Sequence, residues 1–509
     1  MPRTRETALI IAILSSLAIW FVWAAIDPLP LVEDEFSYVL QSRIFASGHW
    51  TAPSPPIPEF FQQAHVLTVP AVASKYAPGH ALLMSIGSFL GAPALVPLLL
   101  TGLTGALLFL LVRRVSNERV GLLAWIVWLS DPTNLRFRAA YYSEVTSEAM
   151  LFIAWWALLE WRERHERRWL LVLAAAVGWG AITRPLTMLA FAVPIGVVVL
   201  RDVIRRRRWT DFAAAFALGT LMLGVLPLWS AETTGNWRVT PQALWTKQYL
   251  PFDHPGFGVD TTPPARPLLA VNRDTYLSFY KYHVDHTPAH LPRIAFERLS
   301  AIARGEWSGP RLVLVPFVLV GLFAMNAAVG FALGSALLLF AAYLSYGHWA
   351  EWTLYYFEGL PVLSVLAALG LWRGYDWLLA RGTTSVVLRR AGGLAAAGVV
   401  LLAAYELETW RFNRVRMASY DVAFRQLLDK LPMHGAVLFV QYAPRIGPHS
   451  NVVQNSPDLR DDPIWVVNDL GARDTALMRY AGPRIPLKFY EDGGKIEVYR
   501  SLLRPTTAR

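Results

Sequence analysis

The sequence predicts an α-helical, polytopic membrane protein that carries a small α/β domain at its C-terminal end. Three observations predict this class. The chain has 509 residues, of which 54% are hydrophobic. Its apolar residues form blocks close to the roughly 20 residues that a helix needs to cross a bilayer. Short arginine-rich segments separate these blocks, a pattern that a large soluble domain does not have.

The blocks correspond to about eleven crossings. The first block begins like a signal peptide, but it is too long for one, and no small-residue cleavage site follows it. We therefore expect a retained first span whose arginine-bearing N-terminus lies inside. The expected spans lie at residues 7–26, 93–112, 118–130, 147–161, 169–183, 186–200, 211–230, 310–324, 327–346, 356–373 and 391–407.

The arginine positions and the span count predict the same orientation. With the N-terminus inside, every arginine cluster between spans falls on the inner side, as the positive-inside rule requires. These clusters lie at residues 113–119, 162–168, 201–208 and 373–390. The segments expected outside are 27–92, about 131–146, 231–309 and the tail from 408.

The composition changes after the last span. The runs "AVLFV", "IWVVN", "LKFYE" and "IEVYR" are short and β-prone, and turns and helix-like segments separate them. They predict a membrane module over 1–407 and a periplasmic α/β domain over 408–509. The absence of an internal sequence repeat weighs against a transporter built from duplicated halves.

Charge and cysteine usage exclude several classes of protein. The formal net charge is +10, but the arginines sit at the ends of apolar blocks and no basic face is interleaved with aromatic residues. The charge therefore indicates topology and not nucleic-acid binding. Because the chain has no cysteine, disulfides, thiolate nucleophiles and cysteine metal sites are excluded.

Acidic residues cluster at the outer edges of two spans. The stretch "LVEDEFSY" places Glu33, Asp34 and Glu35 directly after the first span, and "YYSEVTSEAM" places Glu144 and Glu148 at the start of another. A charge within a span costs about 2.5 to 3.5 kcal/mol, so acids kept at span edges are functional candidates. The alternative, a solvated loop start, is the reading we favour for Glu33.

A carboxylate beside a lipid-accessible groove can take a proton from an acceptor hydroxyl while that oxygen attacks an anomeric carbon. A glycosidase needs a second carboxylic acid to protonate its leaving group. A lipid phosphate needs cationic stabilisation instead, which Lys75 or Arg184 could supply. One base, one or two cations and a membrane groove therefore favour sugar transfer from a lipid-phosphate donor over hydrolysis.

Several motifs resemble those of a known family. "EDEFSY", "GHWTAPSPP", "ASKYAPGH", "TSEAM", "AITRP" and "YYFEGLPVLSVLAALGLW" occur in this order. Together they resemble bacterial membrane glycosyltransferases of the GT-C superfamily, and within it the branch of protein O-mannosyltransferases and lipid A aminoarabinose transferases. The resemblance runs over most of the membrane part and implies a GT-C-like fold.

The resemblance also implies roles for individual residues. Asp34 would be the general base and Glu35 its companion. Glu148 would be the second acid, with Glu144 as its rival. Lys75, in "KYAP", would contact the donor phosphate, and the neighbouring tyrosine of that motif, Tyr76, is a secondary candidate.

Further phosphate contacts are implied less directly. Arg184 matches the "TRP" position, where a structural role is equally open. Many relatives have an Arg-Tyr pair before "LPVL", whereas this chain has Leu354 and Tyr355. Tyr355 thus remains a candidate for the phosphate site. If the arginine of the relatives binds the phosphate, then His348, Lys281 or an outer-loop arginine would do so in this chain.

The resemblance implies transfer from a polyprenyl-phosphate-linked sugar, with inversion, on the periplasmic side of a bacterial inner membrane. The acceptor class stays open between lipid, glycan and protein, and membrane lipids surround the chain. The alternatives are a transporter or flippase of lipid-linked sugars, and a non-catalytic subunit that binds glycans or proteins. No cofactor is certain, but a divalent cation stays open. His283, His286 and His290 in "YHVDHTPAH" are candidate ligands whose spacing matches no defined metal motif.

Overall fold

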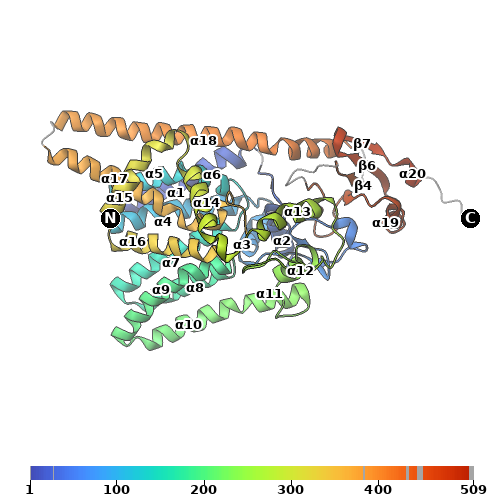
Figure 1. Cartoon of the computed structure of the whole chain (residues 1–509), viewed down its shortest axis with the longest axis horizontal. Helices are drawn as coiled ribbons and strands as arrows, with labels where there is room; N and C mark the ends of the chain where they lie inside the picture. The colour runs from blue at the N-terminus through green and yellow to red at the C-terminus, as the bar shows by residue number, and fades with distance from the viewer. Residues whose placement is uncertain (1, 27, 382–384, 432–434, 444–450, 504–509) are drawn as a thin grey trace, which may run out of the picture.

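The computed structural model describes residues 2–26, 28–381, 385–431, 435–443 and 451–503. The molecule is elongated, with a helical bundle at one end and a small sheet domain at the other (Figure 1). Between them lies a layer formed by the loops and short helices of residues 27–92 and 231–309, the two long segments expected outside and called the first and second outer segments below.

The helices and strands follow the order in the chain. The α-helices are α1 (Pro2–Ile19), α2 (Glu33–Ala46), α3 (Gly79–Phe89), α4 (Leu95–Val115), α5 (Glu118–Leu129), α6 (Pro132–Arg138), α7 (Glu144–Arg164), α8 (Arg167–Ala181), α9 (Pro185–Arg206), α10 (Trp209–Leu223), α11 (Val225–Thr234), α12 (Pro241–Tyr249), α13 (Ala270–Val284), α14 (Leu291–Glu306), α15 (Val315–Ala324), α16 (Ala327–Tyr343), α17 (Pro361–Ala380), α18 (Ser385–Asp429), α19 (Asp474–Ala481) and α20 (Arg500–Leu503). The strands are β1 (Ala52–Pro53), β2 (Val66–Leu67), β3 (Ala71–Ser74), β4 (Ala436–Gln441), β5 (Ile464–Asn468), β6 (Ile485–Tyr490) and β7 (Lys495–Val498).

A helix lies at each expected span, but the helices differ in length. Among the described residues, six are long and apolar enough to cross a membrane. A seventh is added if the pair Pro288–Glu306 and Gly309–Ala324, bent by 104°, is taken as one span. Helices such as α5, with 12 residues, and α8, with 15, are shorter than a full crossing. The protein is therefore a multi-pass membrane protein, while a count of about eleven spans stays a prediction.

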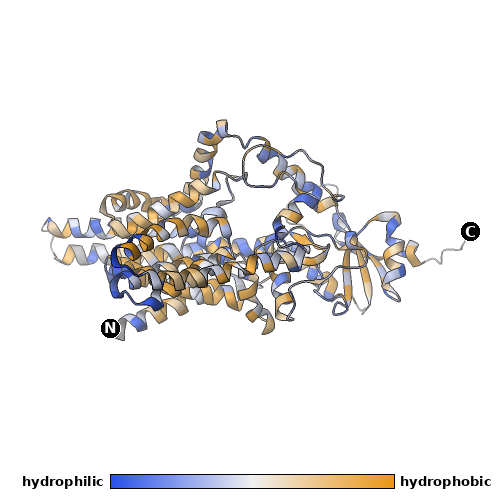
Figure 2. Ribbon diagram, turned by 90° about the horizontal axis from the view of Figure 1, so that it is seen from below, coloured by the Kyte–Doolittle hydropathy of each residue, from blue (hydrophilic) through white to orange (hydrophobic). Residues whose placement is uncertain are grey.

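Apolar side chains cover the outside of the bundle. Exposed residues such as Leu189, Val197, Phe216 and Leu221 lie on α9 and α10, as expected for surfaces that face lipid. Hydrophilic residues gather at the end of the bundle that bears the N-terminus, away from the sheet domain (Figure 2). The bundle thus has an apolar belt bounded by polar ends.

Small residues allow close helix packing inside the bundle. A Cβ atom at Gly370 of α17 would overlap the carbonyl oxygen of Phe317 on α15, and one at Gly321 of α15 would overlap that of Leu366 on α17. Only glycine fits at both positions, so the two backbones touch directly, a common device in membrane helix pairs.

The C-terminal domain contains a four-stranded sheet in the order β5-β4-β6-β7. Strand β4 runs parallel to β5 and β6, and β7 pairs antiparallel with β6. Phe424 of α18 packs on one face of the sheet, and Phe60 of the first outer segment packs on the other. The small α/β unit is therefore present, but the expected boundary at residue 407 falls inside α18, which runs unbroken from the bundle to the sheet (Figure 1).

Candidate active site

A cavity of about 1030 Å³ lies between the bundle and the outer segments. Six of the residues predicted from the sequence line it, namely Asp34, Lys75, Tyr76, Glu144, Arg184 and Tyr355. They come from α2, the turn after β3, the start of α7, the residue before α9, and the segment before α17. Residues distant in the sequence therefore converge on one cavity.

Asp34 lies in the first turn of α2, where the partial positive charge of the helix N-terminus favours a carboxylate. The hydroxyl of Tyr76 donates a hydrogen bond to its Oδ1 at 2.5 Å, and Nδ1 of His65 lies 3.5 Å from its Oδ2. Burial by itself raises the pKa of Asp34, but the charge and hydrogen bond of His65, the bond from Tyr76 and the charge of Lys75 together lower it. Asp34 is therefore ionised and able to accept a proton.

A set of hydrogen bonds fixes α2 against the small sheet of the first outer segment. The hydroxyl of Ser37 donates to the carbonyl oxygen of His65 at 2.8 Å, and the backbone N–H of Ser74 donates to Oε1 of Gln41 at 2.9 Å. The backbone N–H of Lys75 also donates to the carbonyl oxygen of His65, at 3.0 Å. These bonds place Lys75 beside Asp34.

The ammonium group of Lys75 rests on aromatic rings. Its Nζ lies 4.0 Å from the ring centroid of Trp245 and 5.1 Å from that of Tyr76. Within the described part of the chain it makes no hydrogen bond or ion pair. Burial lowers the pKa of Lys75, against the nearby charges of Asp253, Asp34 and Glu33, which raise it. A buried cation without a direct carboxylate partner is suited to bind an anion.

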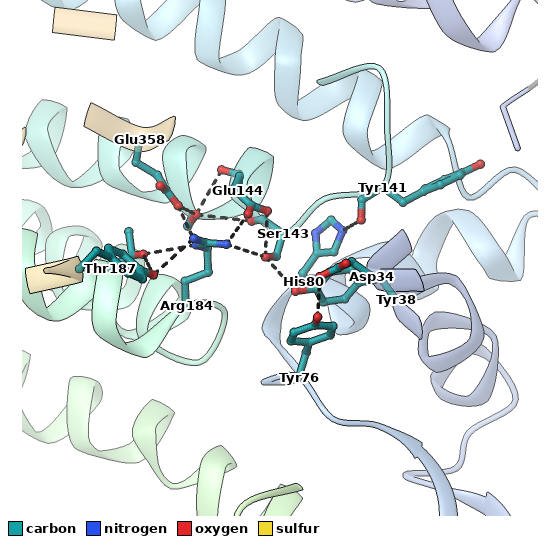
Figure 3. A network of polar contacts seen from close by, with 12 residues as sticks. Asp34, Tyr38, Tyr76, His80, Tyr141, Ser143, Glu144, Arg184, Thr187 and Glu358 are labelled. Atoms are coloured by element: carbon teal, nitrogen blue, oxygen red, sulfur yellow. Dashed lines mark hydrogen bonds and ion pairs between the residues drawn. The ribbon is translucent and has the colours of Figure 1, made fainter. Parts of the chain in front are cut away.

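Arg184 lies between two carboxylates (Figure 3). It forms ion pairs with Glu144 and, through Nε at 3.1 Å, with Glu358. Its Nη2 also donates to the hydroxyl of Tyr343 at 3.4 Å. Because its charge is already balanced, Arg184 is a weaker candidate than Lys75 for holding a phosphate.

The two halves of the site are connected through a serine. The hydroxyl of Tyr38, on the same helix as Asp34, donates to Oγ of Ser143 at 3.0 Å, and Ser143 donates to Oε2 of Glu144 at 3.2 Å. The ring of Tyr38 stacks on that of Tyr76, with centroids 4.8 Å apart. The Asp34 side and the Arg184 side therefore form one network, which Figure 3 shows from close by.

The other acids have different surroundings. Glu35 is buried, and its carboxylate accepts hydrogen bonds from the backbone N–H groups of Leu31 at 3.1 Å and Tyr141 at 3.0 Å. It therefore shapes the backbone around Asp34. Glu33 is also buried, so the interpretation of Glu33 as a solvated residue is wrong.

Glu148 lies outside the cavity. It is completely buried one helical turn after Glu144 and forms an ion pair with the equally buried Arg138 of α6. The acid of α7 that lines the cavity is thus Glu144, which the sequence analysis ranked second.

Of the remaining candidates for the phosphate site, one lines the cavity and two do not. Tyr355 lines the cavity and packs against Tyr343, with centroids 4.9 Å apart. His348 does not line it: its Nε2 lies 3.0 Å from the hydroxyl of Tyr356, and its Nδ1 lies 2.8 Å from the carbonyl oxygen of Trp349. Lys281 is exposed and also lies outside the lining.

The three histidines proposed as metal ligands do not converge. Nε2 of His283 lies 3.7 Å from Oδ1 of Asp253, the ring of His286 stacks on Phe257, and Nδ1 of His290 lies 2.9 Å from the backbone oxygen of Asp285. Across the described ranges, no group of three or more histidine and acidic side chains is placed to hold a metal ion.

Sequence reasoning missed four residues of the site. Glu358 precedes an apolar span, so the signal that selected Glu148 could have found it. His65, Trp245 and Asp253 carry no such signal. They reach the site through tertiary contacts alone.

Comparison with known proteins gives a match to a protein-family model and matches to solved structures. The family model described as dolichyl-phosphate-mannose-protein mannosyltransferase matches residues 79–230, which include Glu144 and Arg184. The structure of ArnT from Cupriavidus metallidurans bound to undecaprenyl phosphate is 17% identical, with a TM-score of 0.54 over 98% of this chain and 95% of that chain. The resemblance to GT-C membrane glycosyltransferases is confirmed.

The apo structure of the same ArnT matches this chain equally, with a TM-score of 0.54, 16% identity, and coverage of 99% of this chain and 96% of that one. An Archaeoglobus fulgidus oligosaccharyltransferase tethered with an acceptor peptide has a TM-score of 0.44 and 15% identity, over 85% of this chain and 61% of that one. No curated protein sequence matches this chain. At 16–17% identity, the two ArnT structures establish the fold alone.

Proposed function

We propose that this protein is a membrane glycosyltransferase that moves a sugar from a polyprenyl-phosphate donor to an acceptor in the cell envelope. The observation that carries the proposal is the convergence of an ionised carboxylate, Asp34, and a cation without a direct carboxylate partner, Lys75, on one large cavity. The fold of this chain is similar to that of ArnT, whose structure holds undecaprenyl phosphate, and this similarity supports a polyprenyl-phosphate donor.

Asp34 is the general base of the proposed reaction. Its carboxylate takes the proton of the acceptor hydroxyl, and the acceptor oxygen forms a bond to the anomeric carbon. The bond between that carbon and the phosphate oxygen breaks, and polyprenyl phosphate leaves with the electron pair. A single displacement of this kind inverts the anomeric configuration.

Lys75 is the proposed contact for the leaving phosphate. Its ammonium group neutralises charge that grows on the phosphate oxygens as the bond breaks, which is where electrostatic stabilisation is most effective. Arg184 orients the wall of the cavity through Glu144 and Glu358, and Tyr355 and Tyr76 offer aromatic and hydroxyl contacts.

Turnover tests the proposal directly. Purified protein in lipid nanodiscs is incubated with polyprenyl-phosphate sugars and with lipid, glycan and protein acceptors, and products are identified by mass spectrometry. We expect a product with the opposite anomeric configuration to the donor. If no donor in the panel is consumed, while a labelled lipid-linked sugar moves between leaflets of liposomes containing the protein, the transporter alternative replaces this proposal.

The proposed site faces the periplasm, with the N-terminus in the cytoplasm. Because the chain has no cysteine, single introduced thiols report orientation. Lys495→Cys in the sheet domain and Arg205→Cys at the opposite end are both exposed positions. A membrane-impermeant thiol reagent is expected to label only Lys495→Cys in spheroplasts. Labelling of Arg205→Cys alone would show that the protein has the opposite orientation.

A further inference from the structure

An apolar crevice of about 400 Å³ runs through the bundle away from the candidate active site. It lies between α4, α7, α9, α16 and α17, and its walls include Leu111, Phe152, Trp155, Val329 and Val362. Along α7 the lining extends from Phe152 to Arg162, a rise of about 15 Å. A volume of about 400 Å³ that extends over this length between apolar helices can hold a linear hydrocarbon chain.

A second cavity of about 420 Å³ adjoins the crevice at the N-terminal end of the bundle. The two share Val115, Leu159 and Arg162 in their walls. The second cavity is lined mainly by charged residues, namely Arg114, Arg162, Glu163, Asp202, Arg205 and Arg206. An apolar slot therefore opens into a basic mouth at the hydrophilic end of the bundle seen in Figure 2.

The mouth contains more cations than its carboxylates neutralise. Arg114 pairs with Glu160 and Glu163, Arg164 pairs with Glu160, and Arg162 pairs with Asp202 at 3.2 Å. Among the described residues, Arg205 is exposed and forms no ion pair, and Nη1 of Arg206 lies at hydrogen-bond distance from Nε2 of His165 and not from a carboxylate. With the adjoining Arg164 and Glu160 included, five guanidinium groups thus face three carboxylates.

We propose that this composite site binds an anionic phospholipid of the surrounding leaflet. Its phosphate lies among Arg162, Arg205 and Arg206, and one acyl chain occupies the crevice. One guanidinium group can donate two parallel hydrogen bonds to a phosphate. Basic pockets between helices at the inner face of a membrane bind anionic headgroups. The crevice ends at Glu358, the partner of Arg184, so the lipid approaches the candidate active site from the opposite side without entering it.

Lipid retention tests the proposal. The full chain is placed in phosphatidylcholine nanodiscs that contain phosphatidylglycerol with the same acyl chains, and native mass spectrometry counts the lipids that stay bound. We expect the protein to retain phosphatidylglycerol preferentially. Arg205→Gln should lower this preference about fivefold, since one arginine near the headgroups contributes about 1 kcal/mol.

The matched control is Arg201→Gln, one helical turn earlier on α9, exposed and outside both cavities. It should leave the preference unchanged. Ala332→Phe and Ala328→Phe each fill the crevice from α16 and should remove the retained lipid; thermal unfolding identifies which of the two variants folds. Equal retention of both lipids by the unmodified protein, an Arg201→Gln effect as large as that of Arg205→Gln, or full retention by a folded crevice variant would each overturn the proposal.

Discussion

The cavity around Asp34 and the buried region around Arg138 both contain acidic and basic side chains. Those of Asp34 and Lys75 face open space, whereas those around Arg138 are buried as ion pairs. Asp34 and Lys75 face a space of about 1030 Å³. Arg138 pairs with Glu148, and Arg311 pairs with Asp131 at 3.2 Å, around a space of only about 10 Å³. A sugar fits beside the first set of charges and not beside the second.

The comparison shows what distinguishes a functional charge from a structural one at a membrane edge. In the Arg138 region, each guanidinium group has a carboxylate partner, and that of Arg138 also lies 4.5 Å from the ring centroid of Trp128. Such pairs compensate each other's loss of hydration. Lys75 has aromatic rings instead of a carboxylate partner, so its charge remains available to a ligand.

The largest expected effect is that of Asp34→Asn. An amide cannot take the acceptor proton, so kcat should fall by about 10² to 10⁴-fold. The amide oxygen can still accept the hydrogen bond from Tyr76, so the fold should persist. The measurement is the rate of product formation under saturating donor and acceptor.

Asp260→Asn is the matched control for this variant. Asp260 lines the same cavity but is exposed, and its carboxylate accepts a hydrogen bond from the backbone N–H of Thr262. Its kcat should stay near that of the unmodified protein. Undiminished turnover in Asp34→Asn would remove Asp34 from its assigned role as base.

Glu148→Gln should act on stability instead. The substitution leaves the buried guanidinium group of Arg138 without its partner, which typically costs about 3 to 5 kcal/mol. We expect a lower free energy of unfolding in denaturant, with the kcat of the folded fraction preserved. Unchanged stability with lost turnover would instead support the catalytic role that the family resemblance implies for Glu148.

The contrast between Glu144 and Glu148 shows where prediction from sequence stops. Both lie on α7 four residues apart, about 6 Å along the axis. Which of them reaches the cavity depends on α6, which brings Arg138 to Glu148, and on Arg184, which pairs with Glu144. Neither partner is specified by the local sequence around the acids.

The membrane class and the C-terminal sheet were predictable, and the family resemblance named both Asp34 and Lys75, which line one cavity. Hydropathy and strand patterns are local signals, and Asp34 and Lys75 belong to one outer segment. Trp245, which supports the ammonium group of Lys75, lies on the short helix α12, and His65, which contacts Asp34, lies in the turn before β2. No local pattern in either segment points to the site. Their roles follow only from the three-dimensional arrangement.

Lys75→Gln should weaken donor binding. Loss of a charge-assisted contact typically costs about 1.5 to 3 kcal/mol, so the KM for the donor should rise about 10 to 100-fold. Lys247→Gln is the matched control because Lys247 also lines the cavity but is exposed. An equal rise in both variants would show that the general positive field, and not the position of Lys75, attracts the phosphate.

The pH dependence of donor binding gives the smallest and most specific test. The pKa of Lys75 is lowered by burial from the ordinary value of 10.5, so its ammonium group loses its proton at a lower pH than an exposed lysine does. Donor affinity should therefore decline as pH rises through this lowered pKa. The pKa of Asp34 is also lowered, so Asp34 stays ionised as the pH falls and does not set the acidic limit. Lys75→Arg keeps its charge at any such pH, so it should move the alkaline decline to higher pH; an unchanged alkaline limb would assign that decline to another group.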